Sequence, residues 1–163
     1  MARIRPDHFI PERVESLAIM YLTRREDLSV RREVRSDGVM DLMVEIKDPG
    51  RPAGWKKFGV YLQGTKSPVT LAVADAKMKL CLRRFFADFG EPSIPFCLFY
   101  FTMEDNKGYF AWIAEPTIDG GHFRLKYHES KADCVLLSDE VIDGAVDSVD
   151  RYYAAFYDTV IRS

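Results

Sequence analysis

The stretch VMDLMVEIKDPGRPAGWKKFGVYLQ (39–63) decides the fold. It consists of two segments in which every second residue is apolar, the period that is typical of half-buried β-strands. The segment 48–55 between them contains two prolines and two glycines, a composition that predicts a turn or loop. The apolar positions are Leu42, Val44 and Ile46 before this loop and Phe58, Val60 and Leu62 after it. We therefore expect a long antiparallel β-hairpin, with one face toward the core.

Helices are expected on either side of the hairpin. Pro11 suits the first turn of a helix, and the polar stretch 23–27 ends that helix. Its core stripe comprises Val14, Leu17, Ala18, Tyr21 and Leu22. A second helix is expected over 72–89, ended by Gly90 and Pro92. It carries apolar Ala76, Leu80, Phe85 and Phe86 among Lys77, Lys79, Arg83 and Arg84.

The remainder of the chain adds strands and a final helix. The apolar run 94–101 predicts a strand covered on both faces, and 109–114 and 122–127 predict two more. From Asp139 to the end, a helix carries Ile142, Ala145, Val149, Tyr152 and Phe156. This order predicts a single mixed α/β domain over 1–163, with a core at about 10–116 and a C-terminal extension over 117–163.

Composition excludes several classes of protein. The 163 residues carry a formal net charge of -2, and no run approaches the ~20 apolar residues of a membrane span, so no membrane partner is expected. Phosphate-loop, dinucleotide-binding, zinc-protease and nucleophile-elbow motifs are missing from the sequence. The cysteines Cys81, Cys97 and Cys134 are widely spaced among apolar neighbours, which favours buried thiols in a reducing compartment and a cytoplasmic location.

Six segments together suggest a family. They are ESLAIMYL from Glu15, DGVMDLMVEI, GRPAGWKKFGV, VYLQGTKSP, IPFCLFYF and GYFAWIAEP. This pattern resembles the PD-(D/E)XK, or restriction-endonuclease-like, superfamily, and within it the bacterial branch catalogued as the four-three-six-five domain of unknown function. The resemblance implies a restriction-endonuclease-like core: a mixed sheet with a long β-hairpin, flanked by helices. It also implies a nuclease-related function of a bacterial, defence-type system.

The site implied by the resemblance is a metal-dependent phosphodiesterase centre. Glu15 and Asp41 match the positions that hold Mg²⁺ or Mn²⁺, a hard cation that stabilises charge and positions water. The third motif departs from the family, because Tyr61 stands at its Gln position and Gln63 at its catalytic Lys position. Lys66 could replace that lysine if a β-bulge at Gly64 turned it to the same face, and Lys77 or Lys79 of the following helix are the other replacements. Two hypotheses stay open: a nuclease with a relocated lysine, and a nuclease-like domain that no longer cleaves.

Charge and aromatic residues suggest partners. A basic group before the hairpin and a second group on the helix over 72–89 could hold a phosphate backbone; the candidates are Arg31, Arg32, Arg35, Lys77 and Lys79. The segment 133–158 is acidic, with seven carboxylates against one arginine. The apolar side of the last helix, widened by Tyr153 and Tyr157, could dock a protein partner or a second copy. The alternative function is therefore a non-enzymatic interaction or oligomerisation module.

Overall fold

The computed structural model describes residues 9–34, 40–52 and 54–162. In chain order, the elements are α1 (Phe9–Leu22), β1 (Leu28–Val34), β2 (Met40–Ile46), β3 (Lys56–Thr65), α2 (Leu71–Phe89), β4 (Phe96–Thr102), β5 (Lys107–Asp119), β6 (His122–Tyr127), β7 (Val135–Leu136) and α3 (Asp139–Arg162). The expected α/β class is confirmed, since a mixed seven-stranded sheet is flanked by three helices within this part of the chain.

The sheet has the order β1-β2-β3-β4-β5-β6, and β7 pairs with β5 beside it. Strands β1, β2 and β3 pair with one another in antiparallel order, and α2 then connects β3 to β4, which runs parallel to β3. The expected hairpin is confirmed, with Leu42 opposite Val60 and Val44 opposite Phe58. All four of these side chains are buried, as the period of two requires.

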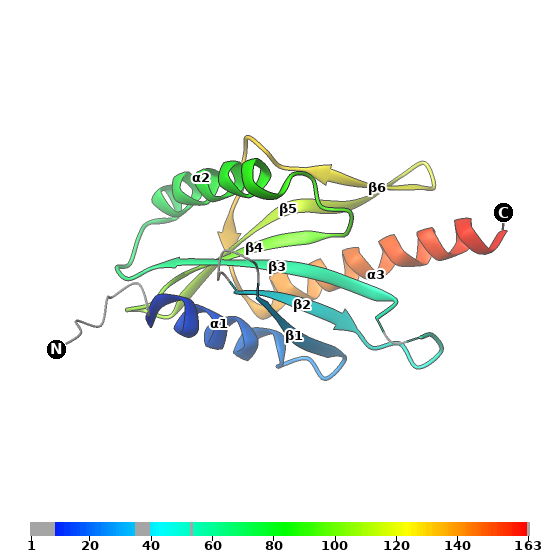
Figure 1. Cartoon of the computed structure of the whole chain (residues 1–163), viewed down its shortest axis with the longest axis horizontal. Coiled ribbons are helices and arrows are strands. Elements are labelled where there is room, and N and C mark those ends of the chain that lie inside the picture. The colour runs from blue at the N-terminus through cyan, green and yellow to red at the C-terminus, as the bar shows by residue number, and fades with distance from the viewer. Residues whose placement is uncertain (1–8, 35–39, 53, 163) are drawn as a thin grey trace.

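Helices cover both faces of the sheet (Figure 1). Helix α2 lies on one face, and α1 and α3 lie on the other. Strand β4 is buried on both sides: Cys97, Phe99 and Phe101 face α1 and α3, whereas Leu98 and Tyr100 face α2. The continuous apolar run over 94–101 thus reflects a central strand between two helical layers, as predicted.

Strand β1 was not expected from the sequence. Its residues LSVRREV contain three charged side chains, and it pairs along the whole of β2 as the edge of the sheet. One of these charges, Arg32, lies opposite Leu42 and faces α1, where it meets the buried carboxylate of Glu15. Because Arg32 is exposed and charged, it interrupts the apolar alternation by which a strand is recognised in the sequence.

Helix α2 buries a different face from the one that its most obvious apolar residues suggest. The buried residues are Ala74, Met78, Leu82 and Phe85, at spacings of four, four and three. Leu80 is 62% exposed, and Ala76 is exposed beside it. The sequence of α2 therefore carries two apolar stripes, and packing against the sheet uses one of them.

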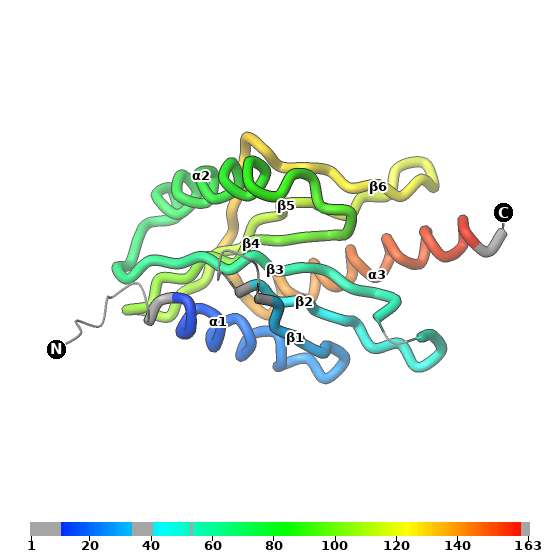
Figure 2. The backbone as a smooth tube through the Cα atoms, viewed as in Figure 1, coloured from blue at the N-terminus to red at the C-terminus, as the bar shows by residue number. Residues whose placement is uncertain are grey.

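The C-terminal part belongs to the same core as the rest of the domain. Strand β5 continues through residue 116 to Asp119, and the α3 residues Ile142, Val146 and Val149 are buried in the cluster that also contains α1. The tube in Figure 2 follows α3 across the sheet on the side of α1. No helix in the described ranges combines the length and apolar character needed to cross a membrane.

Candidate functional site

Glu15 and Asp41, the expected metal ligands, are the two buried carboxylates among the described residues. Glu15 follows Val14 on α1 and is drawn toward the sheet with it. There it forms an ion pair with Arg32 of β1. The side chain of Glu15 is 5% exposed and that of Arg32 is 65% exposed. The guanidinium therefore covers the carboxylate from the solvent side and supplies its counter-charge.

Asp41 lies within the sheet itself, on β2. It follows Met40 at the start of β2 and lies opposite Glu33 of β1 in a regular antiparallel register. Because neighbouring residues of a strand point to opposite faces, Asp41 is directed away from the face that Leu42 shares with α1. The register thus assigns the two carboxylates to opposite faces of the sheet. Within the described ranges, no three His, Cys, Asp or Glu side chains gather where they could hold a metal ion.

The third motif lies on β3 with the parity that the sequence predicts. Val60 and Leu62 face α1, whereas Tyr61 faces α2 and packs its ring 5.2 Å from the ring of Phe85. Gln63 has the same parity as Tyr61 and is half-buried, in register with Tyr100 of β4. The position to which the resemblance assigns a catalytic lysine therefore carries a neutral amide beside an apolar cluster.

Lys66 lies beyond the end of β3 and is exposed. The pairing of β3 with β4 runs in regular steps through Gly64 to Thr65, so the bulge that would turn Lys66 to the face of Gln63 is missing from this register. Gly64 itself is needed for close packing. A Cβ there would lie 2.6 Å from Cγ2 of Val14 and 2.9 Å from the backbone oxygen of Phe101.

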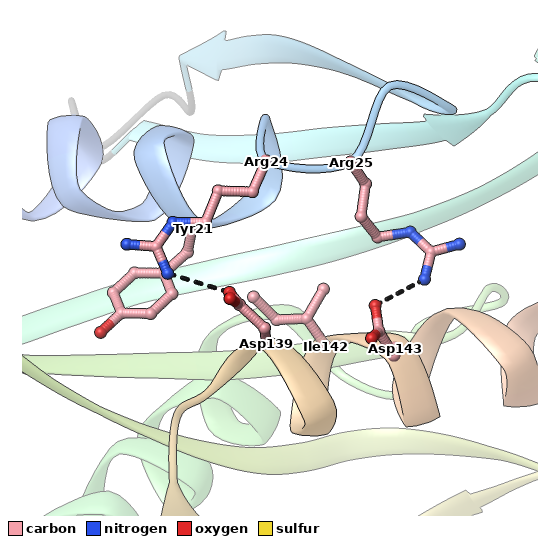
Figure 3. Close-up of a pocket in the computed structure, with 6 residues that line it drawn as sticks. All are labelled: Tyr21, Arg24, Arg25, Asp139, Ile142 and Asp143. Carbon is pink, nitrogen blue, oxygen red and sulfur yellow. Dashed lines mark hydrogen bonds and ion pairs between the residues drawn. The ribbon is translucent and has the colours of Figure 1, made fainter.

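The arginines before the hairpin are held by carboxylates of the same chain. Figure 3 shows Arg24 on Asp139 and Arg25 on Asp143 at the start of α3, at 2.9 and 2.7 Å. Arg25 also binds Asp27 at 2.8 Å and lowers the pKa of that carboxyl group. Arg24, Arg25, Asp139 and Asp143 border a hollow of about 180 Å³. The basic N-terminal and acidic C-terminal segments therefore neutralise each other where they meet.

The candidates for contact with nucleic acid differ in how much free charge they offer. Arg31 is paired with Glu33 at 3.0 Å and Arg32 with Glu15, and Arg35 lies outside the described residues. On α2, by contrast, the cations have no carboxylate within ion-pair distance anywhere in the described chain. They are Lys77, Lys79, Arg83 and Arg84. Among the candidates for contact with nucleic acid, those on α2 are therefore the ones without an intramolecular ion pair in the described ranges.

The loop of the hairpin is fastened to α3 by a buried lysine. Lys56 is 8% exposed and binds Asp48 at 3.0 Å and Asp150 of α3. Burial opposes its charge, but the hydrogen bonds to Asp150 and Asp48 outweigh burial and raise the pKa of Lys56. Sequence reasoning missed this contact because the partners are far apart in the chain.

Aromatic residues complete the same junction. The ring of Trp55 lies 5.4 Å from that of Tyr157, and the hydroxyl of Tyr153 donates to the backbone oxygen of Lys57 at 2.7 Å. Burial raises the pKa of Tyr153 to about 12. Phe156 packs on Phe123 of β6. The aromatic side of α3, expected to dock a partner, is therefore largely covered by the hairpin loop and β6.

The cysteines offer no nucleophile at neutral pH. Cys97 is buried, and Cys81 and Cys134 are half-buried, each as a free thiol. Burial raises the pKa of all three thiols, that of Cys134 to about 11. A thiol is reactive as its thiolate, so these groups are suited to packing.

Comparison with protein-family models, with curated proteins and with solved structures gives no match. Function is therefore inferred from the fold and from the side chains described above.

Proposed function

We propose that this chain is a nuclease-related domain with a restriction-endonuclease-like core that has exchanged hydrolysis for the binding of an anionic macromolecule. The fold supports the first part of this proposal. A long β-hairpin, formed by β2 and β3, lies within a mixed sheet flanked by helices on both faces. The sequence segments that carry the family resemblance coincide with α1, the hairpin, β4 and β5.

The single observation that carries the loss of hydrolysis is the ion pair between Glu15 and Arg32. A carboxylate that binds Mg²⁺ or Mn²⁺ directs its negative charge at the metal. In this chain, the guanidinium of Arg32 pairs with Glu15 from the solvent side, in the place where a metal ion would bind. A divalent cation at Glu15 would have to displace Arg32, and Asp41 points away from the same face.

The β3 residues support the same conclusion. Phosphodiester cleavage requires a positive group near the attacking water to stabilise the developing charge. Gln63 is neutral, and Lys66 is exposed beyond the end of the strand. Retained hydrolysis would therefore depend on Lys77 or Lys79, which belong to a helix on the face opposite α1.

Helix α2 supports the binding function. Its four cations are free of intramolecular carboxylates within the described ranges, so their charge is available to a partner. Two classes of anionic macromolecule can satisfy such cations. One is nucleic acid, which the family resemblance suggests and whose phosphates a helix can hold without reading bases, and the other is an acidic protein surface. The four cations of α2 would bind the anionic partner through their positive charge.

The proposal is tested by incubating plasmid and single-stranded DNA with the whole chain in Mg²⁺ and in Mn²⁺. We expect no cleavage by the wild-type protein, and none by the variant Gln63→Lys, because Arg32 still neutralises Glu15 in that variant. Asp41→Ala serves as the matched control. Cleavage by the wild-type protein that disappears in Asp41→Ala would overturn the loss of hydrolysis and restore the metal-dependent nuclease.

A further inference from the structure

We propose that the outer face of α2 is a docking surface for an acidic amphipathic helix of another protein. This inference rests on the proposed binding function and names its partner. The face is the second apolar stripe of α2, made by Val73, Ala76, Leu80 and Ala87, all exposed.

The spacing of this stripe is that of a helix-packing seam. Its residues follow one another by three, four and seven positions, so they lie in one row along the helix. Leu80 projects from the centre with 62% of its surface exposed, and the alanines on either side leave room for a second backbone. The 19 residues of α2 give a surface about 28 Å long, enough for a partner helix of five turns.

Positive charges border the stripe on both sides. At 100° per residue, Lys77 and Arg84 lie along one edge, with Asp88 as the one carboxylate beside them, and Lys79 and Arg83 lie along the other. This is the arrangement in which flanking charges select the partner of a helix pair. The complementary surface is a helix with an apolar row bordered by glutamates or aspartates.

A second copy of this chain does not supply that surface. Two α2 helices placed together would bring four cations and one carboxylate against the same set, so like-charge repulsion would predominate. Helix α3 is acidic, but its apolar residues Ile142, Val146 and Val149 are buried in its own core. The partner is therefore a different protein.

The stripe also favours a protein over nucleic acid. Phosphates would satisfy the four cations but would leave Leu80 and Val73 in water, whereas a helix with an apolar row removes both from water. Burial of Leu80 is thus the contact that separates the two classes of partner.

The test uses a labelled 21-residue peptide with leucines at heptad positions a and d and glutamates at e and g. A matched peptide has serine in place of leucine, and a labelled DNA oligonucleotide of similar length represents the polyanion. Binding to the whole chain is measured by fluorescence anisotropy, with peptide up to about 1 mM. The variants are Leu80→Ser, the double variant Lys77→Glu/Arg84→Glu, and Met20→Ser, which removes an equally exposed apolar side chain from α1.

We expect the leucine peptide to bind and the serine peptide to bind at least about tenfold more weakly. Leu80→Ser and the charge reversal should each weaken binding by about tenfold or more, and Met20→Ser should leave it unchanged. The inference would be overturned if the wild-type protein failed to bind the leucine peptide or bound both peptides equally. It would also be overturned if Met20→Ser weakened binding as much as Leu80→Ser. DNA binding that is tighter than peptide binding and insensitive to Leu80→Ser would also overturn it, in favour of a polynucleotide. None of these results depends on DNA cleavage, so the two proposals fail separately.

Discussion

Lys56 fastens the hairpin loop to α3, and its removal should destabilise the domain measurably. In the variant Lys56→Met, the aliphatic stem is kept while the charge is lost. The side chain is 10% exposed, and its ammonium group binds two carboxylates, one on the loop (Asp48) and one on α3 (Asp150). The substitution leaves these carboxylates facing an apolar group.

The magnitude follows from how far each partner is buried. Removing one member of a fully buried ion pair costs about 3–5 kcal/mol. The side chains of Asp48 and Asp150 are 28% and 48% exposed, so water screens them. The expected loss is then about 1–2 kcal/mol of the free energy of unfolding, or about 2–8 °C in Tm for a chain of this size.

The loss should depend on pH in a definite way. The pKa of Lys56 is raised above 10.5, so its contribution is present at neutral pH and is lost as pH rises through the folded-state pKa. The pKa of Asp48 is lowered below 3.8, chiefly by the hydrogen bond from Lys56, so its contribution is complete above about pH 3.8 and is lost as pH falls through its lower folded-state pKa. The difference between the wild-type protein and Lys56→Met should be largest between about pH 5 and pH 9 and should shrink outside this range.

Urea unfolding, followed by tryptophan fluorescence, measures this difference. The single variants Lys56→Met and Asp150→Asn and the double variant form a cycle, in which we expect a coupling of about 0.5–1 kcal/mol. A loss below about 0.5 kcal/mol at pH 7, or a loss of the same size at pH 3 and pH 7, would refute this account of the junction.

Three further changes test other parts of the structure. Gly64→Ala should lower the free energy of unfolding in urea by about 1–3 kcal/mol, because the added Cβ would meet a backbone oxygen of β4. Gly144→Ala on α3 places its Cβ in open space and should raise the same free energy by about 0.5–1 kcal/mol. Equal effects of the two substitutions would contradict the close packing at Gly64. Cys97 should react with a thiol reagent at pH 8 only on unfolding, and Cys134 should react faster as pH approaches 11; rapid labelling of both in the native protein at pH 7 would contradict their burial. Tyr153→Phe should cost about 0.5–1.5 kcal/mol through loss of its hydrogen bond to the hairpin backbone, and an unchanged stability would argue against that bond.

The hairpin could be predicted from sequence because the inward residues at its centre are apolar. Leu42 and Val44 on β2 meet Val60 and Phe58 on β3, and a period of two records this directly. Strand β1 could not be predicted in the same way, because Arg32 follows Leu28 and Val30 on the same face and interrupts their apolar alternation. Its partner Glu15 lies 17 positions earlier on α1, so a local pattern cannot show that the two charges pair.

Helix α2 illustrates a second limit. Its sequence contains a row through Met78 and Leu82 and another through Leu80, and both have helical spacing. Only packing against β4 and β5 decides which row is buried. The ion pairs of Arg24 and Arg25 with α3 span more than a hundred residues, so they were likewise beyond local reasoning.

We propose that Arg32, rather than a metal ion, balances the charge of Glu15. Isothermal titration of Mn²⁺ into the wild-type protein and into Arg32→Met tests it directly, with Glu15→Gln as the control. We expect no Mn²⁺ binding by the wild-type protein up to about 1 mM. Stoichiometric binding by the wild-type protein that is abolished by Glu15→Gln and unaffected by Arg32→Met would contradict it.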